Sequence, residues 1–152
     1  MLPNKIIAFC VKEKILVKEN DYMIFPSKTW YFKFPQYKVG EFEAKFGVEL
    51  NLSKLTEIYT FTNFFDVKNK VENYMDPSLC CTSEQTYILL QQQLMDLIEV
   101  EMNLIDFERI YAREYDRKIK GINFVDGVTI FGEDVTVYDL LFRDVLDVTP
   151  DE

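Results

Sequence analysis

Two acidic residues, Glu101 and Glu108, stand on the apolar face of a long helix that the sequence predicts. They are seven residues apart, so their carboxylates would stack about two turns from each other on one face. A carboxylate in an apolar setting must be protonated, paired or hydrogen-bonded. Three uses fit the pair: acid–base catalysis in a hydrolase, an oxygen-ligand site for Mg²⁺ or Ca²⁺, and a structural pairing with Lys, Arg or Tyr. We favour the structural pairing, across helix packing or with a second copy of the chain.

Basic residues follow at steps of four, four and three along one flank of the same predicted helix. Like charges at this spacing repel each other, so an acidic group should compensate them. The acidic group could belong to a partner, as an acidic protein surface or as phosphates. It could also be the acidic C-terminal part of this chain, which is the interpretation that we favour. The candidate partner-binding residues are therefore Arg109, Arg113, Arg117, Lys120, Asp139, Asp144 and Asp147.

Aromatic and basic residues also interleave between Lys28 and Lys45, as they do in proteins that bind single-stranded nucleic acid. The alternation of a strand places Trp30 and its aromatic neighbours on one side and leaves only Tyr31 and Lys33 for the other. Two exposed groups do not make a stacking platform. The segment is better interpreted as the core of a sheet, and nucleic acid is not an expected partner.

Several kinds of catalytic and metal site are excluded because the chain contains no His. Without His, it cannot form a Ser–His–Asp or Cys–His nucleophile system or an HExxH zinc site. Its five Gly form no phosphate-binding loop, and its three Cys fit neither a disulfide framework nor a zinc site. We therefore expect a protein that is not an enzyme and that uses no cofactor and no small-molecule substrate.

The charge is unevenly distributed along a chain whose net charge is −9. Residues 1–75 hold 11 Lys against 9 acidic residues, whereas residues 76–152 hold 6 basic against 17 acidic residues. An acidic chain suits a basic protein partner better than nucleic acid. No segment approaches the roughly 20 apolar residues of a membrane span, and the apolar run near the start is too short for a secretory signal. We expect an intracellular protein, in a host cytoplasm or a virion.

The first half of the sequence predicts short elements of both kinds. The pattern of Trp30, Phe32 and Phe34 indicates a strand with one buried face, preceded by a helix and a hairpin. Together they predict an antiparallel β-meander with short helices. The expected elements are a helix at 4–12, a hairpin at 14–18 and 22–25, a strand at 29–34, and helices at 39–46, 53–65 and 67–74. For residues 4–12 an opening strand is the competing interpretation.

The second half predicts one long helix over residues 83–120, because neither Gly nor Pro occurs from Ser78 to Lys120. Thr82 and Gln85 have the spacing of a capping box, and Gly121 can close the far end. A hairpin at 122–131 with an Asp-Gly turn follows, and then a closing helix at 135–146 with Thr136 as its cap. The sequence thus predicts an α+β fold as a single domain, 1–152, which we divide into an N-terminal lobe (1–75) and a helical and hairpin lobe (76–152).

The length of the predicted helix carries the functional hypothesis. A helix of roughly 38 residues is about 55 Å long, and a compact chain of this size is about 40 Å across. Such a helix needs another surface to lie against, which indicates a non-enzymatic interaction subunit of a larger assembly, formed by self-association or with other proteins. The Ala-poor composition, rich in Lys, Ile, Asn, Phe and Tyr, is typical of AT-rich genomes and makes a phage or viral structural component the first concrete hypothesis. The alternative is a small acidic inhibitor or antidote that mimics nucleic acid and blocks the basic cleft of a nucleic-acid-binding enzyme.

Overall fold

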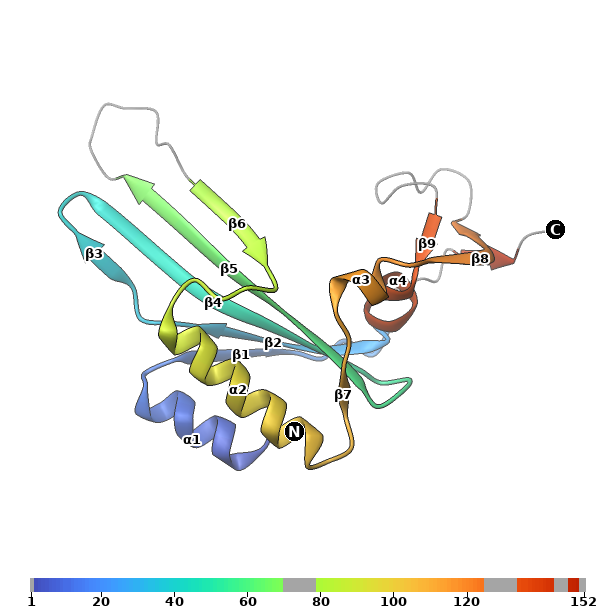
Figure 1. Cartoon of the computed structure of the whole chain (residues 1–152), viewed down its shortest axis with the longest axis horizontal. Coiled ribbons are helices and arrows are strands. Elements are labelled where there is room, and N and C mark those ends of the chain that lie inside the picture. Colours follow the sequence, from blue (N-terminus) through green and yellow to red (C-terminus); the bar gives the residue numbers. More distant parts are fainter. Residues whose placement is uncertain (1, 70–78, 125–133, 144–147, 151–152) are drawn as a thin grey trace.

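The computed structural model describes residues 2–69, 79–124, 134–143 and 148–150 of the 152-residue chain. A large, mainly antiparallel sheet carries two helices on one face, and a smaller lobe with two short helices and a second sheet lies at one end of it (Figure 1). This arrangement confirms the predicted α+β class. Whether the chain is one domain or divides near residue 75 stays a prediction.

The main sheet is built largely from strands that follow one another along the chain, in the order β1-β2-β4-β5-β6. Its strands are β1 (Leu16–Asn20), β2 (Ser27–Lys33), β4 (Phe42–Ser53), β5 (Ile58–Asn69) and β6 (Leu79–Ser83). Two shorter strands complete it: β3 (Tyr37–Val39) pairs with β4, and β7 (Glu108–Arg109) runs parallel to the start of β5. The start of β4 and the end of β5, with β3 and β6 beside them, form an extension that we call the arm (Figure 1).

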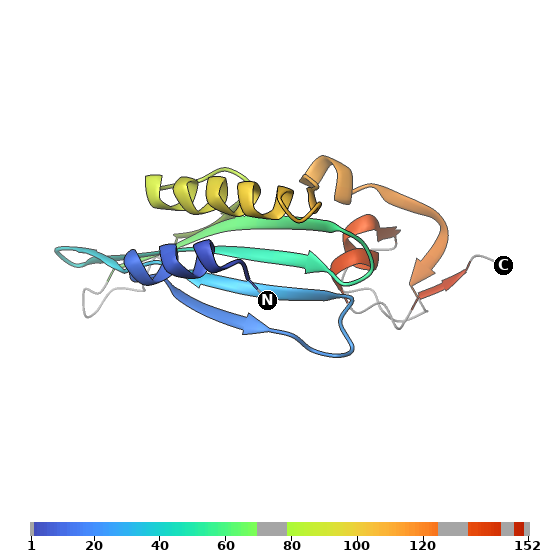
Figure 2. The ribbon, with the colours of Figure 1, turned by 90° about the horizontal axis from the view of Figure 1, so that it is seen from below.

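One face of this sheet is covered by helices α1 (Asn4–Lys12) and α2 (Leu89–Asn103) (Figure 2). Alternate residues of the central strands point into the core on this side. The fully or almost fully buried core residues include Ile6, Trp30, Phe32, Val48, Leu50, Phe61, Leu94 and Ile98. The predicted helix at 4–12 and the predicted inward face of the strand at 29–34 are thereby confirmed.

The predicted helix at 83–120 is wrong in its extent. Helix α2 has 15 residues, about 22 Å by helical rise, and ends at Asn103. Asp106 adopts φ +62°, the Phe107 N–H donates to the Met102 carbonyl at 3.0 Å, and the Asp106 N–H donates to the Asn103 carbonyl at 3.3 Å. This is a Schellman motif in which Asp occupies the left-handed position usually taken by Gly. The chain continues as β7, the short helix α3 (Ala112–Tyr115) and β8 (Lys118–Phe124), so residues 83–120 do not form one long rod.

The start of α2 also differs from the predicted capping box, because Thr82 lies in β6 and Gln85 in the following turn. Gln91 caps the helix instead. Its Oε1 accepts from the Tyr87 N–H at 2.9 Å and the Ile88 N–H at 3.3 Å. Its Nε2 donates to the Gly47 carbonyl of β4 at 2.8 Å, which fastens the helix start to the sheet.

The predicted helices at 39–46 and 53–65 are also wrong, because these residues form β3, β4 and β5. In β4 the apolar Val48, Leu50 and Leu52 alternate with Glu49 and Asn51, and this period of two belongs to a strand. Residues 67–69 of the predicted helix at 67–74 end β5, and the rest lie outside the described residues. The hairpin predicted at 14–18 and 22–25 is replaced by β1 pairing with β2.

The C-terminal lobe contains β8 (Lys118–Phe124), which pairs with β9 (Asp134–Thr136) and β10 (Val148–Pro150), and the helix α4 (Val137–Phe142). A hairpin followed by a short helix is confirmed, although the predicted Asp-Gly turn falls outside the described residues. Helix α4 is shorter than predicted because Arg143 leaves the helix in an extended conformation. Thr136 caps it as predicted, accepting from the Asp139 N–H at 3.3 Å.

Candidate binding cleft

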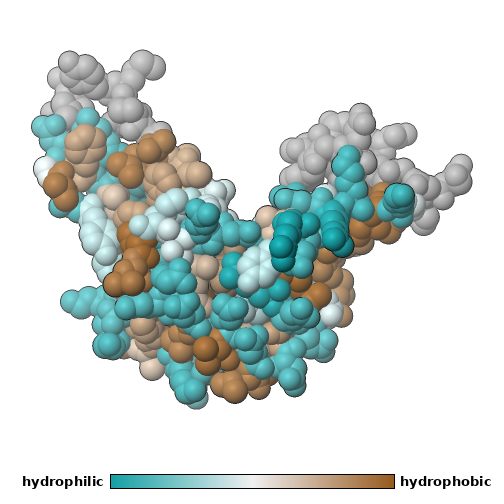
Figure 3. Space-filling view, viewed as in Figure 1, coloured by the Kyte–Doolittle hydropathy of each residue, from teal (hydrophilic) through white to brown (hydrophobic). Residues whose placement is uncertain are grey.

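A hollow separates the arm from the C-terminal lobe (Figure 3). Its base contains two adjoining cavities, about 320 and 380 Å³ in volume, which share Tyr138 and Arg143. We call these two cavities together the cleft. Their walls come from the open face of the sheet, which points away from α1 and α2, and from α3 and α4 of the lobe.

Strand alternation brings polar residues to the open face in rows. Tyr31 of β2 pairs with Glu49 of β4, which pairs with Thr62 of β5. In the next row, Thr29 lies opposite Asn51. Because residues paired across strands share a face, these side chains converge under the lobe although they come from three separate segments.

Asn51 organises the sheet side of the cleft. Its Oδ1 accepts from the Thr29 hydroxyl at 2.7 Å, and its Nδ2 donates to Glu49 Oε1 at 2.9 Å. The same Nδ2 lies 3.5 Å from the Tyr138 hydroxyl oxygen of α4. The buried amide therefore orients a carboxylate from the sheet toward a tyrosine from the lobe.

The lobe is joined to the sheet by a short hydrogen bond, and a cluster of rings inside the lobe positions Tyr138. The Ser27 hydroxyl donates to the Phe142 carbonyl at the end of α4, at 2.7 Å. The Tyr138 ring packs against the rings of Tyr115 and Phe142, at centroid distances of 5.1 and 5.2 Å. These contacts place Tyr115 and Tyr138 on the lobe side of the cleft.

The charges in the cleft do not balance. Arg143 and Asp139 form an ion pair at 3.0 Å, and the Arg143 guanidinium lies 5.1 Å from the centre of the Tyr138 ring. Glu49 and Asp116 have no basic side chain within ion-pair distance in the described part of the chain. The cleft thus carries net negative charge among its described residues.

Three tyrosines of the cleft have a raised pKa, so they stay neutral well above physiological pH. Burial raises the pKa of Tyr138 to about 12, with the nearby Glu49 carboxylate adding to the effect. Burial and then Glu49 raise the pKa of Tyr31, and burial and then Glu84 raise the pKa of Tyr115. The cleft therefore offers neutral hydroxyls and electron-rich ring faces beside carboxylate side chains.

The two carboxylates of the predicted stacked pair lie on different elements. Glu101 is buried in α2 and forms an ion pair with Lys5 of α1 at 2.7 Å, across the packing of the two helices. Glu108 is exposed in β7, so the stacking on one helix is wrong. Among the described residues, no three Cys, Asp or Glu side chains gather in a metal-binding group.

The predicted basic flank is likewise dispersed, because the helix that was to carry it ends earlier. Arg109 of β7 lies between the rings of Phe61 and Tyr111, at 3.8 and 4.2 Å from their centroids. The other three basic residues are exposed, in α3, after it and in β8: Arg113, Arg117 and Lys120.

The predicted acidic counterparts fare differently. Asp139 lines the cleft and pairs with Arg143, which the sequence analysis did not select. Asp144 and Asp147 lie outside the described residues. That these basic and acidic residues bind a partner stays a prediction.

Sequence reasoning missed Glu49, Asn51, Tyr115, Asp116 and Tyr138. The alternation of Val48-Glu-Leu-Asn-Leu52 was the available signal, since it assigns Glu49 and Asn51 to one polar strand face. No local signal placed that face beneath a helix about 90 residues further along the chain.

Comparisons with protein-family models, with curated protein sequences and with solved structures give no match to this chain. The chemistry of the cleft is therefore the basis for a functional proposal. Aromatic faces beside uncompensated carboxylates favour cations, and guanidinium groups above all, because a guanidinium can stack and form hydrogen bonds at once.

Proposed function

We propose that the protein is a non-enzymatic interaction subunit of a larger protein assembly, and that its cleft binds a basic segment of a partner protein. The observation that carries this proposal is the combination of Tyr31, Tyr115 and Tyr138 with the unpaired carboxylates of Glu49 and Asp116 in one hollow. An Arg or Lys of the partner would stack on a ring and neutralise a carboxylate. We place this function inside a cell or in a virion.

The chain's own Arg143 supports the chemistry. Its guanidinium stacks over Tyr138 while it pairs with Asp139, so the cleft already holds one cation by the proposed means. Tyr31 with Glu49, and Tyr115 with Asp116, repeat the combination of ring and carboxylate on either side of it. A partner with two spaced basic side chains would match this repetition.

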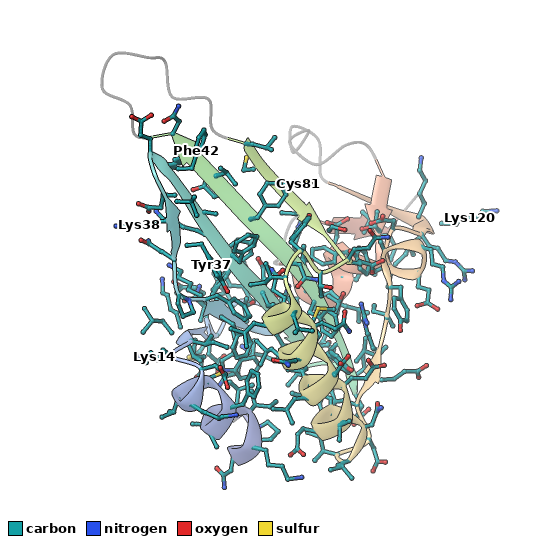
Figure 4. All side chains as sticks on the ribbon, turned by 60° about the vertical axis from the view of Figure 1, so that its left-hand side comes forward. Lys14, Tyr37, Lys38, Phe42, Cys81 and Lys120 are labelled. Atoms are coloured by element: carbon teal, nitrogen blue, oxygen red, sulfur yellow. The ribbon has the colours of Figure 1, made fainter. Side chains whose placement is uncertain are left out.

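Exposed apolar residues on the arm support the assembly part of the proposal. Four apolar side chains of the arm are about half exposed or more: Tyr37 and Val39 of β3, Phe42 of β4 and Leu79 of β6. The strand register places them on the same face of the arm, and Tyr37 and Phe42 lie along it in Figure 4. Apolar side chains gathered in this way mark contact surfaces more often than isolated ones do.

The alternative, an acidic inhibitor that enters a basic cleft, has weaker support. Such an inhibitor must present its carboxylates on a projecting surface, and Glu49 is half-buried at the base of a hollow. A concave acidic site receives a basic segment, whereas a convex one enters a basic cleft.

None of the helices in the described part of the chain has the length and apolar character of a membrane-spanning segment.

The test uses a fluorescein-labelled peptide of alternating Gly and Arg, followed by fluorescence anisotropy. The double variant Glu49→Gln, Asp116→Asn should weaken binding by about tenfold, because two attractive charge contacts are removed. The control is Glu41→Gln, which removes one negative charge from the exposed turn between β3 and β4. That control should bind as the unchanged protein does.

Equal binding by the double variant and the unchanged protein would remove the cleft as the binding site. An equal loss in Glu41→Gln would assign the binding to overall charge and overturn the proposal in the same way. A peptide in which Glu replaces Arg should not bind, and added salt should weaken the Arg peptide.

A further inference from the structure

A third cavity, about 420 Å³ in volume, lies at the other end of the open face, where β2 ends and the chain turns into β3. Its walls are mainly apolar and come from Leu16, Phe34, Phe46 and Phe64. Its volume falls in the usual range for small-molecule sites. We call it the apolar pocket.

A break in strand pairing creates this pocket. Pairing between β2 and β4 ends at Lys33 and Gly47, and pairing of β4 with β3 resumes only at Ala44 and Tyr37. Between them Pro35 interrupts the chain, because it has no N–H to donate to a neighbouring strand. Within the gap the Phe34 N–H still donates to the Phe46 carbonyl at 3.1 Å, and both residues line the pocket.

Gly47 shapes one wall of the pocket. A Cβ atom on this residue would lie only 2.0 Å from the Phe64 ring. The ring therefore rests directly on the backbone of β4, which any larger residue at position 47 would prevent. In this position Phe64 forms part of the apolar wall.

Lys14 stands at the rim because of how α1 ends. It adopts φ +56°, the Ile15 N–H donates to the Cys10 carbonyl at 2.8 Å, and the Lys14 N–H donates to the Val11 carbonyl at 3.3 Å. This is again a Schellman motif, in which Gly is the favoured residue. The chain has a cation there at some conformational cost.

The charge around the pocket is positive, in contrast to the cleft. Lys14 and Lys33 have no acidic partner within ion-pair distance in the described part of the chain. The remaining cation, Lys45, pairs with Glu43 at 3.3 Å. The one carboxylate of the wall, Asp66, lies 3.8 Å from Lys68 and is partly neutralised by it.

We propose that the apolar pocket binds a small amphiphile with a carboxylate head and a single apolar tail, as in a fatty acid. The tail would lie against the rings of Phe34, Phe46 and Phe64, and the head would lie between Lys14 and Lys33. This site is independent of the proposed function, since its ligand has the opposite charge and lies at the other end of the open face.

The test is isothermal titration calorimetry with butyrate, hexanoate, octanoate and decanoate, each below its micelle concentration. Each added pair of methylenes should tighten binding by roughly tenfold until the pocket is filled, because each buried methylene contributes to transfer from water. Octanol, which has the tail of octanoate without its charge, should bind several times more weakly.

Two variants locate the site without disturbing the fold. Leu16 is 73% exposed, so Leu16→Glu should fold normally and weaken octanoate binding by at least about tenfold through like-charge repulsion. Lys14→Gly removes a rim cation and suits the left-handed position, so it should weaken binding several-fold without loss of stability. The control is Lys120→Gln, an exposed cation of β8 that lies across the molecule from Lys14 (Figure 4).

Three outcomes would overturn the proposal. The first is binding that does not depend on tail length. The second is undiminished octanoate binding by Leu16→Glu, and the third is an equal loss in Lys14→Gly and Lys120→Gln, which would indicate a nonspecific response to charge. The cleft variant Glu49→Gln, Asp116→Asn should bind octanoate normally, which separates failure here from failure of the proposed function.

Discussion

The two faces of the main sheet have opposite character, although the same strands supply both. One face is apolar and packs into the core, and the other carries polar side chains that line the cleft. Phe32 points into the core under α1 and α2 and is fully buried. Its neighbour Tyr31 points the other way, into the cleft. One face, the closed face, is covered by α1 and α2, and the other, the open face, is covered at one end by the C-terminal lobe. Under the proposed function, alternate residues of one strand act separately on folding and on binding.

The closed face contributes apolar burial, and the open face contributes oriented polar groups. Trp30 and Leu50, which pair across the strands on the closed side, have almost no exposed surface. On the open side, Asn51 has its hydrogen bonds arranged around Glu49 and Tyr138. We expect changes to the first face to act on stability and changes to the second to act on recognition.

The largest expected change in the free energy of unfolding comes from comparing two adjacent residues that face opposite sides of the sheet. Phe32→Ala should lower the free energy of unfolding by about 3–5 kcal/mol, because it removes a fully buried ring from the core. Tyr31→Ala should lower it by only about 1 kcal/mol, since Tyr31 is half-buried and faces the cleft. Urea denaturation of the two variants measures the difference. Similar losses would show that the open face is part of the folding core and that the division between the faces is wrong.

Gln91 sharpens the comparison because it is a fully buried polar residue on the closed side. Gln91→Ala should lower the free energy of unfolding by roughly 3 kcal/mol, since it leaves the Tyr87 N–H and the Gly47 carbonyl without their partner. The adjacent Gln92, which is exposed and contacts Asp96, is the matched control. Gln92→Ala should cost about 0.5 kcal/mol or less. A small loss for Gln91→Ala in urea denaturation would mean that water replaces the amide easily.

Alkaline titration addresses the contact between the open face and the lobe. The pKa of Tyr138 is raised from 10.0 to about 12 in the folded protein, so the folded state keeps its phenol proton where the unfolded chain loses it. The stability due to the neutral phenol is therefore complete below pH 10 and is lost as pH rises toward 12, at up to ~1.4 kcal/mol per pH unit. Tyr138→Phe should flatten this part of the stability profile. If the variant and the unchanged protein lose stability in parallel, Tyr138 is not buried against the sheet.

The sequence predicted those features that depend on local patterns. Helix α1, the inward face of Trp30 and Phe32 and the cap at Thr136 all follow from spacing within a few residues. The end of α2 could not be predicted in this way. A Gly at the left-handed position would have indicated a helix end, but Asp106 adopts that conformation here. The helix predicted at 53–65 was wrong because the spacing of its aromatic residues fits a helix and a strand equally well. Long-range pairing with β4 decides in favour of a strand.

The candidate site was less predictable than the fold. The sequence assigned Tyr31 to the face opposite Trp30, which is correct, but it supplied no neighbours for Tyr31 on that face. Those neighbours, Glu49 and Tyr138, come from a strand that was not recognised and from a helix far along the chain. A cleft assembled from distant segments depends on strand register and packing, which the local sequence does not encode.

The smallest expected effect tests the ion pair between Lys5 of α1 and Glu101 of α2. Glu101→Gln should lower the free energy of unfolding by about 1 kcal/mol or less, because the Lys5 side chain is 68% exposed and solvent screens the pair. The double variant Glu101→Gln, Glu108→Gln should leave the metal content of the purified protein unchanged, as measured by mass spectrometry, since the two side chains lie on different elements. A loss of bound metal would assign a ligand role to these carboxylates and make the closed face a functional surface. The expected result would instead leave Glu101 with the structural role of holding α2 against α1.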